Sequence, residues 1–277
     1  MPIQITSVQN ARVKECLKLE KRRQRDAQQL TVVEGAREVL RALESGIVPP
    51  EAFICASLVN TPEAQQASAL LHKLDDARQT RLYEVTPAVF EKLAYRGESG
   101  GIVLVIPYVA RTLAELALGA PPFVTVIEGA EKPGNLGAIL RTADAAGVDA
   151  VIVCTAEGQS GLDLHNPNVV RASLGTLFTV PVAQDSSTAV QQWLREHNIQ
   201  IVVTSPDAKA LYTSIDLRRP TAVVMGSEAD GLSPSWFAAA DQQVQIPMHG
   251  RADSLNLSTA TALLLYEVVR QRQAQNR

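Results

Sequence analysis

The sequence has little of what several protein classes require. Its three cysteines, Cys16, Cys55 and Cys154, lie far apart without a C-x-x-C pair, and its four histidines form no cluster with them. We therefore expect neither a disulfide framework nor a structural zinc site, and predict no metal. The longest apolar runs, such as Ala262–Tyr266, are far shorter than the roughly 20 residues of a membrane-spanning helix, and no signal-peptide pattern opens the sequence. We predict a cytoplasmic protein without a membrane partner.

The overall composition is that of an ordinary globular protein. The 277 residues are 46% hydrophobic and 20% charged, with 16 glycines and 15 prolines, which argues against disordered, collagenous and coiled-coil chains. A length well above the roughly 150 residues of one domain predicts two domains. The net charge of −3 neither demands nor excludes a nucleic-acid partner, because the position of the charges matters more than their sum.

The positive charge is concentrated near the start of the chain. Residues 10–25 contain only two acids, Glu15 and Glu20, among a run of basic side chains. Such a run is often a solvated helix face, but it can also bind phosphates. With 4% aromatic residues, any RNA contact here is expected to use backbone and shape more than base stacking. The basic residues are Arg12, Lys14, Lys18, Lys21, Arg22, Arg23 and Arg25.

The first half of the chain alternates short β-branched runs with helical segments. Two helix starts carry a hydroxyl cap followed by a proline at the first helical position, at Thr61-Pro62 and at Thr86-Pro87. This pattern predicts a small α/β domain over residues 1–107, followed by a connector over 108–122. The expected strands cover residues 31–33, 52–55 and 101–106, and a further helix covers 36–44.

The second half predicts a mostly parallel sheet, because its apolar runs are nearly continuous, as in strands that are buried on both faces. The runs are Val124–Ile127, Ala150–Val153, Ile199–Val203, Ala222–Met225 and Val244–Ile246. Helices are expected over 136–146, 188–197 and 255–273.

Segments rich in glycine and polar residues follow several of these strands. The first begins at Gly129 and runs to Arg141. It lacks the Lys and Ser/Thr of a phosphate loop, and no G-x-G-x-x-G follows a strand, so a nucleotide- or NAD-dependent enzyme is disfavoured. Asn135 could cap the next helix or belong to a site. Arg141 could pair with a buried acid or clamp a phosphate or ribose.

Two later segments carry more polar residues than local structure needs. Gly226, Gly231 and the Ser233-Pro234 pair suit a strand end, a turn and a helix start, but Glu228 has no such structural reason. In the last segment, Asp253, Ser254, Asn256 and Ser258 crowd the first turn of a helix that one cap would satisfy. His249 is expected to be a loop residue.

Together these segments resemble the three motifs of the SpoU (TrmH-like) RNA 2′-O-ribose methyltransferases of the SPOUT superfamily. The motifs are Asn135-x-Gly137-x3-Arg141, Gly226-x-Glu228-x2-Gly231-Leu232, and Ile246-Pro247-Met248 followed by Ser254-Leu255-Asn256. Residues 166–175 resemble an additional family segment. The resemblance implies S-adenosylmethionine-dependent 2′-O-methylation of RNA, expected to be 23S ribosomal RNA. The alternatives are a tRNA ribose methyltransferase and a non-catalytic RNA-binding or ribosome-assembly protein on the same fold.

The resemblance also implies an organisation of the chain. Residues 123–277 would form a trefoil-knotted α/β methyltransferase domain with a mostly parallel sheet, and residues 1–107 an RNA-substrate-binding domain of ribosomal-protein type. The family forms homodimers through the knot and the last helix, although that helix could simply pack on its own sheet.

Site residues follow from the same resemblance. We expect Arg141 to clamp the ribose-phosphate, Asn135 and Asn256 to orient it, and Ser254 and Glu228 to shape the site. The expected S-adenosylmethionine contacts are Thr204, Ser205, Gly226, Gly231, Ile246, Met248 and Leu255. The expected RNA contacts are Arg12, Lys18, Lys21, Arg22, Arg23, Arg25 and Arg171.

Overall fold

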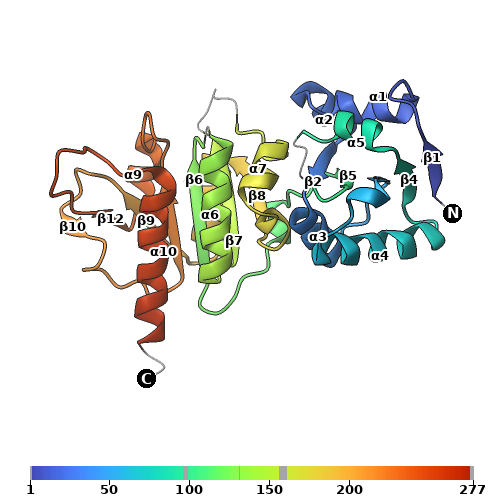
Figure 1. Ribbon diagram of the computed structural model, residues 1–277. Coiled ribbons are helices and arrows are strands. Elements are labelled where there is room, and N and C mark those ends of the chain that lie inside the picture. The colour runs from blue at the N-terminus through green and yellow to red at the C-terminus, as the bar shows by residue number, and fades with distance from the viewer. Residues whose placement is uncertain (1, 96–98, 131, 156–160, 275–277) are drawn as a thin grey trace. The chain divides into compact units, whose positions relative to one another are not determined.

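The computed structural model describes residues 2–95, 99–130, 132–155 and 161–274 (Figure 1). The chain divides into two compact units. The first unit comprises Met1–Val109 and Asp163–Thr179, and the second comprises Ala110–Leu162 and Val180–Arg277. The break after Val109 lies inside the segment predicted as a connector. Residues 163–179 belong to the first unit although they come late in the sequence.

The first unit contains a five-stranded mixed sheet in the order β1-β4-β3-β5-β2. Strand β4 pairs in parallel with β1 and β3, whereas β5 is antiparallel to both β3 and β2. The strands predicted here are present. Their bounds are β1 Ile3–Ile5, β2 Leu30–Glu34, β3 Glu51–Ile54, β4 Arg81–Val85 and β5 Ile102–Pro107.

Helices cover both faces of this sheet (Figure 1). The predicted caps are confirmed: Oγ1 of Thr61 accepts from the Ala64 amide, and Oγ1 of Thr86 accepts from the Val89 amide. One core cluster joins α1 and α5 to the sheet through residues such as Val13. The helices are α1 Ala11–Lys18, α2 Arg22–Gln28, α3 Ala36–Glu44, α4 Pro62–Asp76, α5 Pro87–Leu93 and α7 Pro167–Ala172, with short 3-10 turns η1 Ala56–Leu58 and η3 Thr176–Phe178.

Residues 163–179 are bound into the first unit by buried polar contacts. The Oγ1 atom of Thr31 donates to the His165 carbonyl at 2.6 Å. The amide of Val109 donates to Nε2 of His165 at 3.1 Å, and the imidazole stacks on Tyr108 with 3.5 Å between ring centres. Arg41 donates to the Leu174 carbonyl at 2.7 Å. These bonds fix the late segment against the first sheet and its helices.

The second unit contains a seven-stranded sheet in the order β10-β12-β9-β11-β6-β7-β8. Every pairing in it is parallel, which confirms the prediction from the continuous apolar runs. Strand β11 lies between β6 and β9, although it follows both of them in the sequence. The strands are β6 Phe123–Glu128, β7 Ala150–Thr155, β8 Val182–Ser186, β9 Gln200–Thr204, β10 Ala210–Leu211, β11 Thr221–Met225 and β12 Gln242–Gln245.

Two helix pairs cover this parallel sheet. Helices α6 and α10 pack against each other, and α10 contacts β11. Helices α8 and α9 also contact each other and enclose a core that includes Trp193 and Trp236. The bounds are α6 Pro133–Ala146, α8 Ser187–Glu196, α9 Pro234–Ala239 and α10 Leu257–Gln273, with a 3-10 turn η2 at Leu113–Glu115. None of the helices in the described ranges is both long and apolar enough to cross a bilayer.

Candidate active site

Helix α6 begins earlier than the sequence predicts. Pro133 is its first residue and Lys132 its N-cap, so Asn135 lies inside the first turn. The prediction that Asn135 caps this helix is wrong, because the fixed backbone angle of proline suits the first helical position and sets the start upstream. The Asn135 side chain is therefore available for contacts outside its own helix.

Asn135 is linked to two distant motifs through Glu228. Its Nδ2 donates to Oε1 of Glu228 at 2.8 Å, and Nδ2 of Asn256 donates to the same oxygen at 2.9 Å. Nδ2 of Asn256 also lies 3.1 Å from Oδ1 of Asn135, across 121 residues of sequence. The ammonium group of Lys132 forms an ion pair with Oε2 of Glu228. The structure thus brings these three predicted residues together and adds Lys132, which the sequence reasoning missed.

The charge state of Glu228 follows from these donors. Hydrogen bonds from Lys132 and then from Asn135 lower the pKa of its carboxyl group. Glu228 is therefore ionised at neutral pH and can only accept hydrogen bonds. Its role in this geometry is to hold two amide groups in place, because an ionised carboxylate has no proton to donate.

Asn256 has a second contact that fixes its orientation. Its Oδ1 accepts from the amide of Ser258 at 3.0 Å and from the Ser258 hydroxyl at 2.6 Å. It is thus the N-cap of α10, as its residue type favours. The oxygen binds the helix, which leaves the amide nitrogen directed to Glu228 and Asn135.

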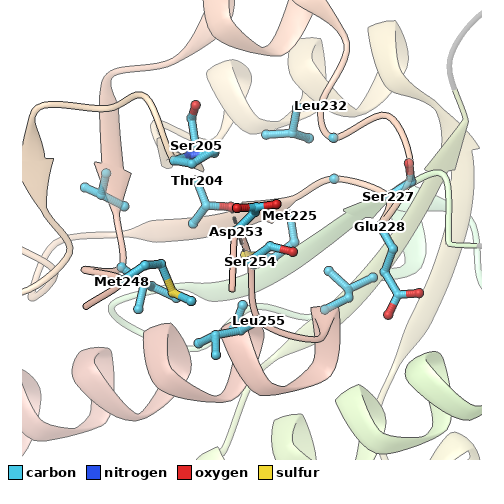
Figure 2. Close-up of a pocket in the computed structure, with 17 residues that line it drawn as sticks. Thr204, Ser205, Met225, Ser227, Glu228, Leu232, Met248, Asp253, Ser254 and Leu255 are labelled. Atoms are coloured by element: carbon cyan, nitrogen blue, oxygen red, sulfur yellow. Dashed lines mark hydrogen bonds between the residues drawn. The ribbon is translucent and has the colours of Figure 1, made fainter. Parts of the chain in front are cut away.

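A cavity of about 270 Å³ adjoins this network (Figure 2). Its 17 lining residues come from the ends of β9, β11 and β12, from the segments that follow these strands, and from the start of α10. The carboxyl ends of parallel strands meet at one edge of a sheet, where ligands bind in open α/β folds. Glu228 and Ser254 line the cavity, as does each residue predicted to contact S-adenosylmethionine: Thr204, Ser205, Gly226, Gly231, Ile246, Met248 and Leu255.

One wall of the cavity is a tight backbone loop. Ser227 and Gly231 exchange two backbone hydrogen bonds of 3.1 Å each. A Cβ atom on Gly226 would lie 2.1 Å from the carbonyl carbon of Gly231. Glycine is required at position 226 because any side chain would force the two arms of the loop apart.

The opposite wall combines apolar side chains with open peptide groups. Met248 and Leu255 line it (Figure 2). In the described chain, none of the backbone hydrogen bonds outside helices and strands involves residues 247–255. Apolar walls with a few available polar groups are typical of a small-molecule site. This cavity can hold a ligand that has an apolar or aromatic part and a polar edge.

Arg141 lies on α6 outside this cavity lining. Its side chain is exposed, and no described residue forms a hydrogen bond or ion pair with it. The alternative that Arg141 pairs with a buried acid is therefore not what the structure shows. An exposed guanidinium keeps all of its donors available for a phosphate or a carboxylate.

The role of one buried acid escaped the sequence reasoning. Glu128, at the end of β6, is 3% exposed. Its Oε1 accepts from the hydroxyls of Ser187 at 2.6 Å and Ser233 at 2.9 Å, and its Oε2 accepts from the Ser233 amide at 2.7 Å. Glu128 thereby anchors the start of α9, directly after the Gly226–Leu232 loop. An acid at the end of an otherwise apolar strand was the available signal.

The predicted RNA-binding residues on α1 and α2 are exposed with one exception. Arg12, Lys18, Lys21, Arg22 and Arg23 lie at the surface.

Arg25 is the exception, because its side chain is 2% exposed and forms an ion pair with Asp163. It also donates to the carbonyls of Leu19 and Glu20 at 2.8 Å each. We therefore withdraw Arg25 from the predicted RNA contacts, since a buried guanidinium with these partners cannot reach a phosphate. Arg171 is half-buried and forms an ion pair with Glu34. Its contact with RNA stays a prediction.

No group of three or more His, Cys, Asp or Glu side chains that could hold a metal ion occurs among the residues the structure describes.

Comparison with protein families places these motifs in a known group. The profile of the SpoU rRNA methylase family matches residues 122–266, and that of the MRM3-like substrate binding domain matches residues 10–104. The chain belongs to the SpoU rRNA methylase family. The resemblance seen in the three motifs is thereby confirmed. The SpoU match covers every residue of the cavity and of the Asn135–Glu228–Asn256 network.

A curated relative and two solved structures extend over most of this SpoU protein. The 23S rRNA (guanosine-2′-O-)-methyltransferase RlmB of Shewanella oneidensis is 34% identical over 81% of this chain and 92% of its own. A crystal structure of an RNA 2′-O ribose methyltransferase is 43% identical, with a TM-score of 0.81 over 98% of this chain and 100% of the other. The AdoMet-bound rRNA methyltransferase of Sinorhizobium meliloti is 29% identical, with a TM-score of 0.85 over 96% and 97%.

Proposed function

We propose that this SpoU protein transfers a methyl group from S-adenosylmethionine to the 2′-hydroxyl of a ribose in RNA, and that the RNA is 23S ribosomal RNA. The observation that carries the proposal is the cavity at the carboxyl ends of β9, β11 and β12, beside the hydrogen-bonded Asn135, Glu228 and Asn256. The name of the Shewanella relative supports the substrate, and the AdoMet-bound neighbour supports the cofactor.

The lining of the cavity suits the chemistry of S-adenosylmethionine. When bound, this cofactor supplies an electrophilic methyl group on a positively charged sulfur. Met248 and Leu255 offer apolar surface to the adenine, and the peptide groups of 247–255 offer donors and acceptors to its polar edges. The carboxylates of Asp253 and Glu228 line the same cavity and favour a cationic ligand. We assign the seven predicted cofactor residues to this site.

The ribose hydroxyl is a weak nucleophile, and it has to be aligned with the methyl group of the cofactor. The methyl group itself needs little further activation. A well-oriented reaction within one site can save roughly 7–11 kcal/mol relative to a reaction between free molecules. Asn135 and Asn256 are held in fixed orientations by Glu228, and their amides can align the sugar. Ser254 lines the cavity and shapes it from the α10 side.

We assign the ribose-phosphate clamp to Arg141. It lies about one and a half turns beyond Asn135 on α6 and has no protein partner in the described chain, so its donors are available to a phosphate. Guanidinium groups stay protonated in proteins, so we assign Arg141 to binding and not to removal of the hydroxyl proton.

The first unit is assigned to the selection of RNA. The exposed cations of α1 and α2 would contact phosphates and give a strong dependence on salt. The profile match to a substrate binding domain over residues 10–104 supports this assignment.

Three further features belong to the same proposal. We propose that the second unit contains the trefoil knot of the SPOUT superfamily, and that the enzyme acts in the cytoplasm. We also propose a homodimer that forms through α10, because Leu263 and Tyr266 are 38% and 50% exposed on this helix.

Gel filtration with light scattering of wild type and of Tyr266→Glu tests the dimer, which should dissociate in the variant.

Methyl transfer to defined RNAs tests the proposed function. Purified protein is incubated with unmodified 23S rRNA or with tRNA and cofactor labelled on the methyl group, and nucleosides are identified by mass spectrometry. We expect one 2′-O-methylated nucleoside in 23S rRNA. Transfer to tRNA alone would favour the tRNA alternative. Cofactor binding without transfer to either RNA would favour a non-catalytic protein, and absence of cofactor binding by calorimetry would overturn the assignment of the cavity.

A further inference from the structure

The first unit contains a second cavity, of about 180 Å³. The side chains of Leu17, Val32 and Leu93 give it apolar surface, and Glu20, Asn166 and Asn168 give it polar groups. It is smaller than the cavity of about 270 Å³ in the second unit. Its size therefore suits one flat ring system better than a whole nucleotide cofactor.

Tyr95 lines this cavity and presents an unusually exposed aromatic ring. Its side chain is 71% exposed, the largest value among the exposed hydrophobic residues of the described chain. Its backbone amide donates to Oε2 of Glu34 at 2.8 Å, which fixes the main chain at this position. Covering an exposed aromatic ring removes apolar surface from water, so a ligand that stacks on this ring would gain free energy.

Arg171 holds Tyr95 from one side. Its guanidinium carbon lies 4.5 Å from the centre of the Tyr95 ring. The same guanidinium forms an ion pair with Glu34 and donates to Oδ1 of Asn168 at 2.5 Å. A cation over one face of a tyrosine stabilises the ring position by a cation–π contact. The result is a preformed stacking surface built from Tyr95 and Arg171.

The charge balance argues against a phosphate ligand. Two carboxylates, Glu20 and Glu34, line the cavity beside one arginine, which already pairs with Glu34. Burial raises the pKa of the Cys16 thiol, which also lines the cavity, to about 12. The thiol is therefore neutral and has little tendency to bind a metal or act as a nucleophile. A neutral ligand that donates hydrogen bonds fits these surroundings best.

The polar side chains of the cavity determine which hydrogen-bonding groups a neutral, flat ligand must carry. Glu20 has no side-chain partner in the described chain and offers an acceptor. The amide oxygens of Asn166 and Asn168 are occupied by the Asn168 amide and by Arg171, which leaves both NH2 groups as donors. Guanine offers the matching set, with N–H groups for the carboxylate and the O6 and N7 acceptors for the amides.

We propose that this cavity binds one unpaired guanine of the substrate RNA, stacked on Tyr95 and read by Glu20 and the Asn166 and Asn168 amides. Single-stranded RNA is read in this way, by stacking of a splayed base on an aromatic or Arg plane and hydrogen bonds to its edge. The proposal rests on the proposed function, because it takes RNA as the substrate.

Short RNA probes test the stacking part of this site in the full-length protein. Fluorescence anisotropy measures binding of a uridine hexamer that carries one central guanosine. Stacking on an aromatic side chain accounts for about tenfold or more in affinity per base. We expect Tyr95→Ala to weaken binding about tenfold and Tyr95→Phe to bind like wild type. Equal binding by wild type and Tyr95→Ala, with unchanged unfolding midpoints, would overturn the proposal.

Changes to the base and to Glu20 test the hydrogen bonds. Inosine lacks the 2-amino group of guanosine, and adenosine has neither of the donors that a carboxylate would accept there. We expect wild type to prefer guanosine by about tenfold over either, and Glu20→Gln to lose the preference over inosine. Glu91→Gln removes another exposed acid, from α5, and should keep this preference. A wild-type protein with no preference overturns the site.

Methyl transfer by the same preparation separates this proposal from the proposed function. If wild type methylates 23S rRNA but shows no guanine preference on the probes, the second cavity is not a base site and the function stands. If it neither transfers methyl groups nor binds S-adenosylmethionine, the function fails, whatever the probes show.

Discussion

Two arginines of the first unit and one arginine of the second have opposite surroundings. In the first unit, Arg25 is buried and bound by Asp163 and two carbonyls, and Arg171 is bound by Glu34 and Asn168. In the second unit, Arg141 is exposed on α6 without a partner in the described chain. A guanidinium whose donors are bound by other protein groups stabilises the fold. A guanidinium whose donors have no protein partner can bind a substrate. The sequence around each arginine does not reveal this difference.

Removal of the open arginine should have the largest effect. Arg141→Ala is expected to lower methyl transfer by about 1,000-fold or more, because charge-assisted contacts to the reacting group act mainly in the transition state. The dissociation constant for S-adenosylmethionine should stay within about twofold. Transfer assays and calorimetry measure the two quantities. Arg195→Ala, at an exposed position of α8, should leave both unchanged. An equal loss of binding and transfer would contradict the assigned role.

Removal of a partner from a saturated arginine should instead affect stability. Asp163→Ala leaves the Arg25 charge buried and uncompensated, and should lower the free energy of unfolding by about 3–5 kcal/mol. Urea denaturation followed by circular dichroism measures the change. The control is Asp216→Ala, which removes a surface partner of Arg218 at 2.7 Å and should cost at most about 1 kcal/mol. Similar losses in both variants would contradict the distinction between the two pairs.

His165 provides a pH test of the same buried region. Burial, and next the charge of Arg25, lower its pKa from 6.5 to about 4. The unfolded chain therefore binds a proton that the folded chain does not bind between about pH 6.5 and 4. Stability should fall by roughly 3 kcal/mol as the pH drops through this range.

Urea midpoints at several pH values measure this loss. His165→Gln has no proton to bind at that position, so its midpoint should depend less on pH between 6.5 and 4 than that of wild type. Identical pH profiles for the two proteins would rule out His165 as the source of the effect.

The surface cations should give the smallest effect per residue. Replacement of Arg12, Lys21, Arg22 and Arg23 by Ala is expected to weaken RNA binding about tenfold near physiological salt. It should also flatten the plot of log affinity against log salt by about 0.7–0.9 for each phosphate that the variant no longer binds. Binding titrations at several salt concentrations measure the slope. A slope equal to that of wild type would remove this surface from the RNA interface.

The parts of the fold set by local patterns could be predicted from the sequence. Continuous apolar runs predict the parallel strands of the second unit, and the hydroxyl–proline pairs predict the starts of α4 and α5. The cavity residues could also be named, because three motifs resemble those of the SpoU family and follow strands whose carboxyl ends meet at one sheet edge. Helix α6 begins at Pro133 and not after Asn135, because a proline at the first helical position is the stronger local signal.

Contacts between distant segments could not be predicted in this way. The bond from Thr31 to the His165 carbonyl spans 134 residues, and nothing near Arg25 in the sequence marks Asp163 as its partner. A basic run looks solvated when each residue is judged by its neighbours, so the burial of Arg25 was missed. The pairing of Arg171 with Glu34 and Tyr95 is likewise visible only when the chain has folded.

The division of the chain into two units also determines which fragments can fold and which segments can be exchanged between relatives. The chain leaves the first unit after Val109, returns after Leu162 and leaves again after Thr179. A fragment that ends at Val109 lacks Asp163 and His165, and would expose the buried charge of Arg25. Swapping specificity between relatives therefore requires exchange of both pieces together. During synthesis, the first unit cannot reach its final packing until Thr179 has left the ribosome.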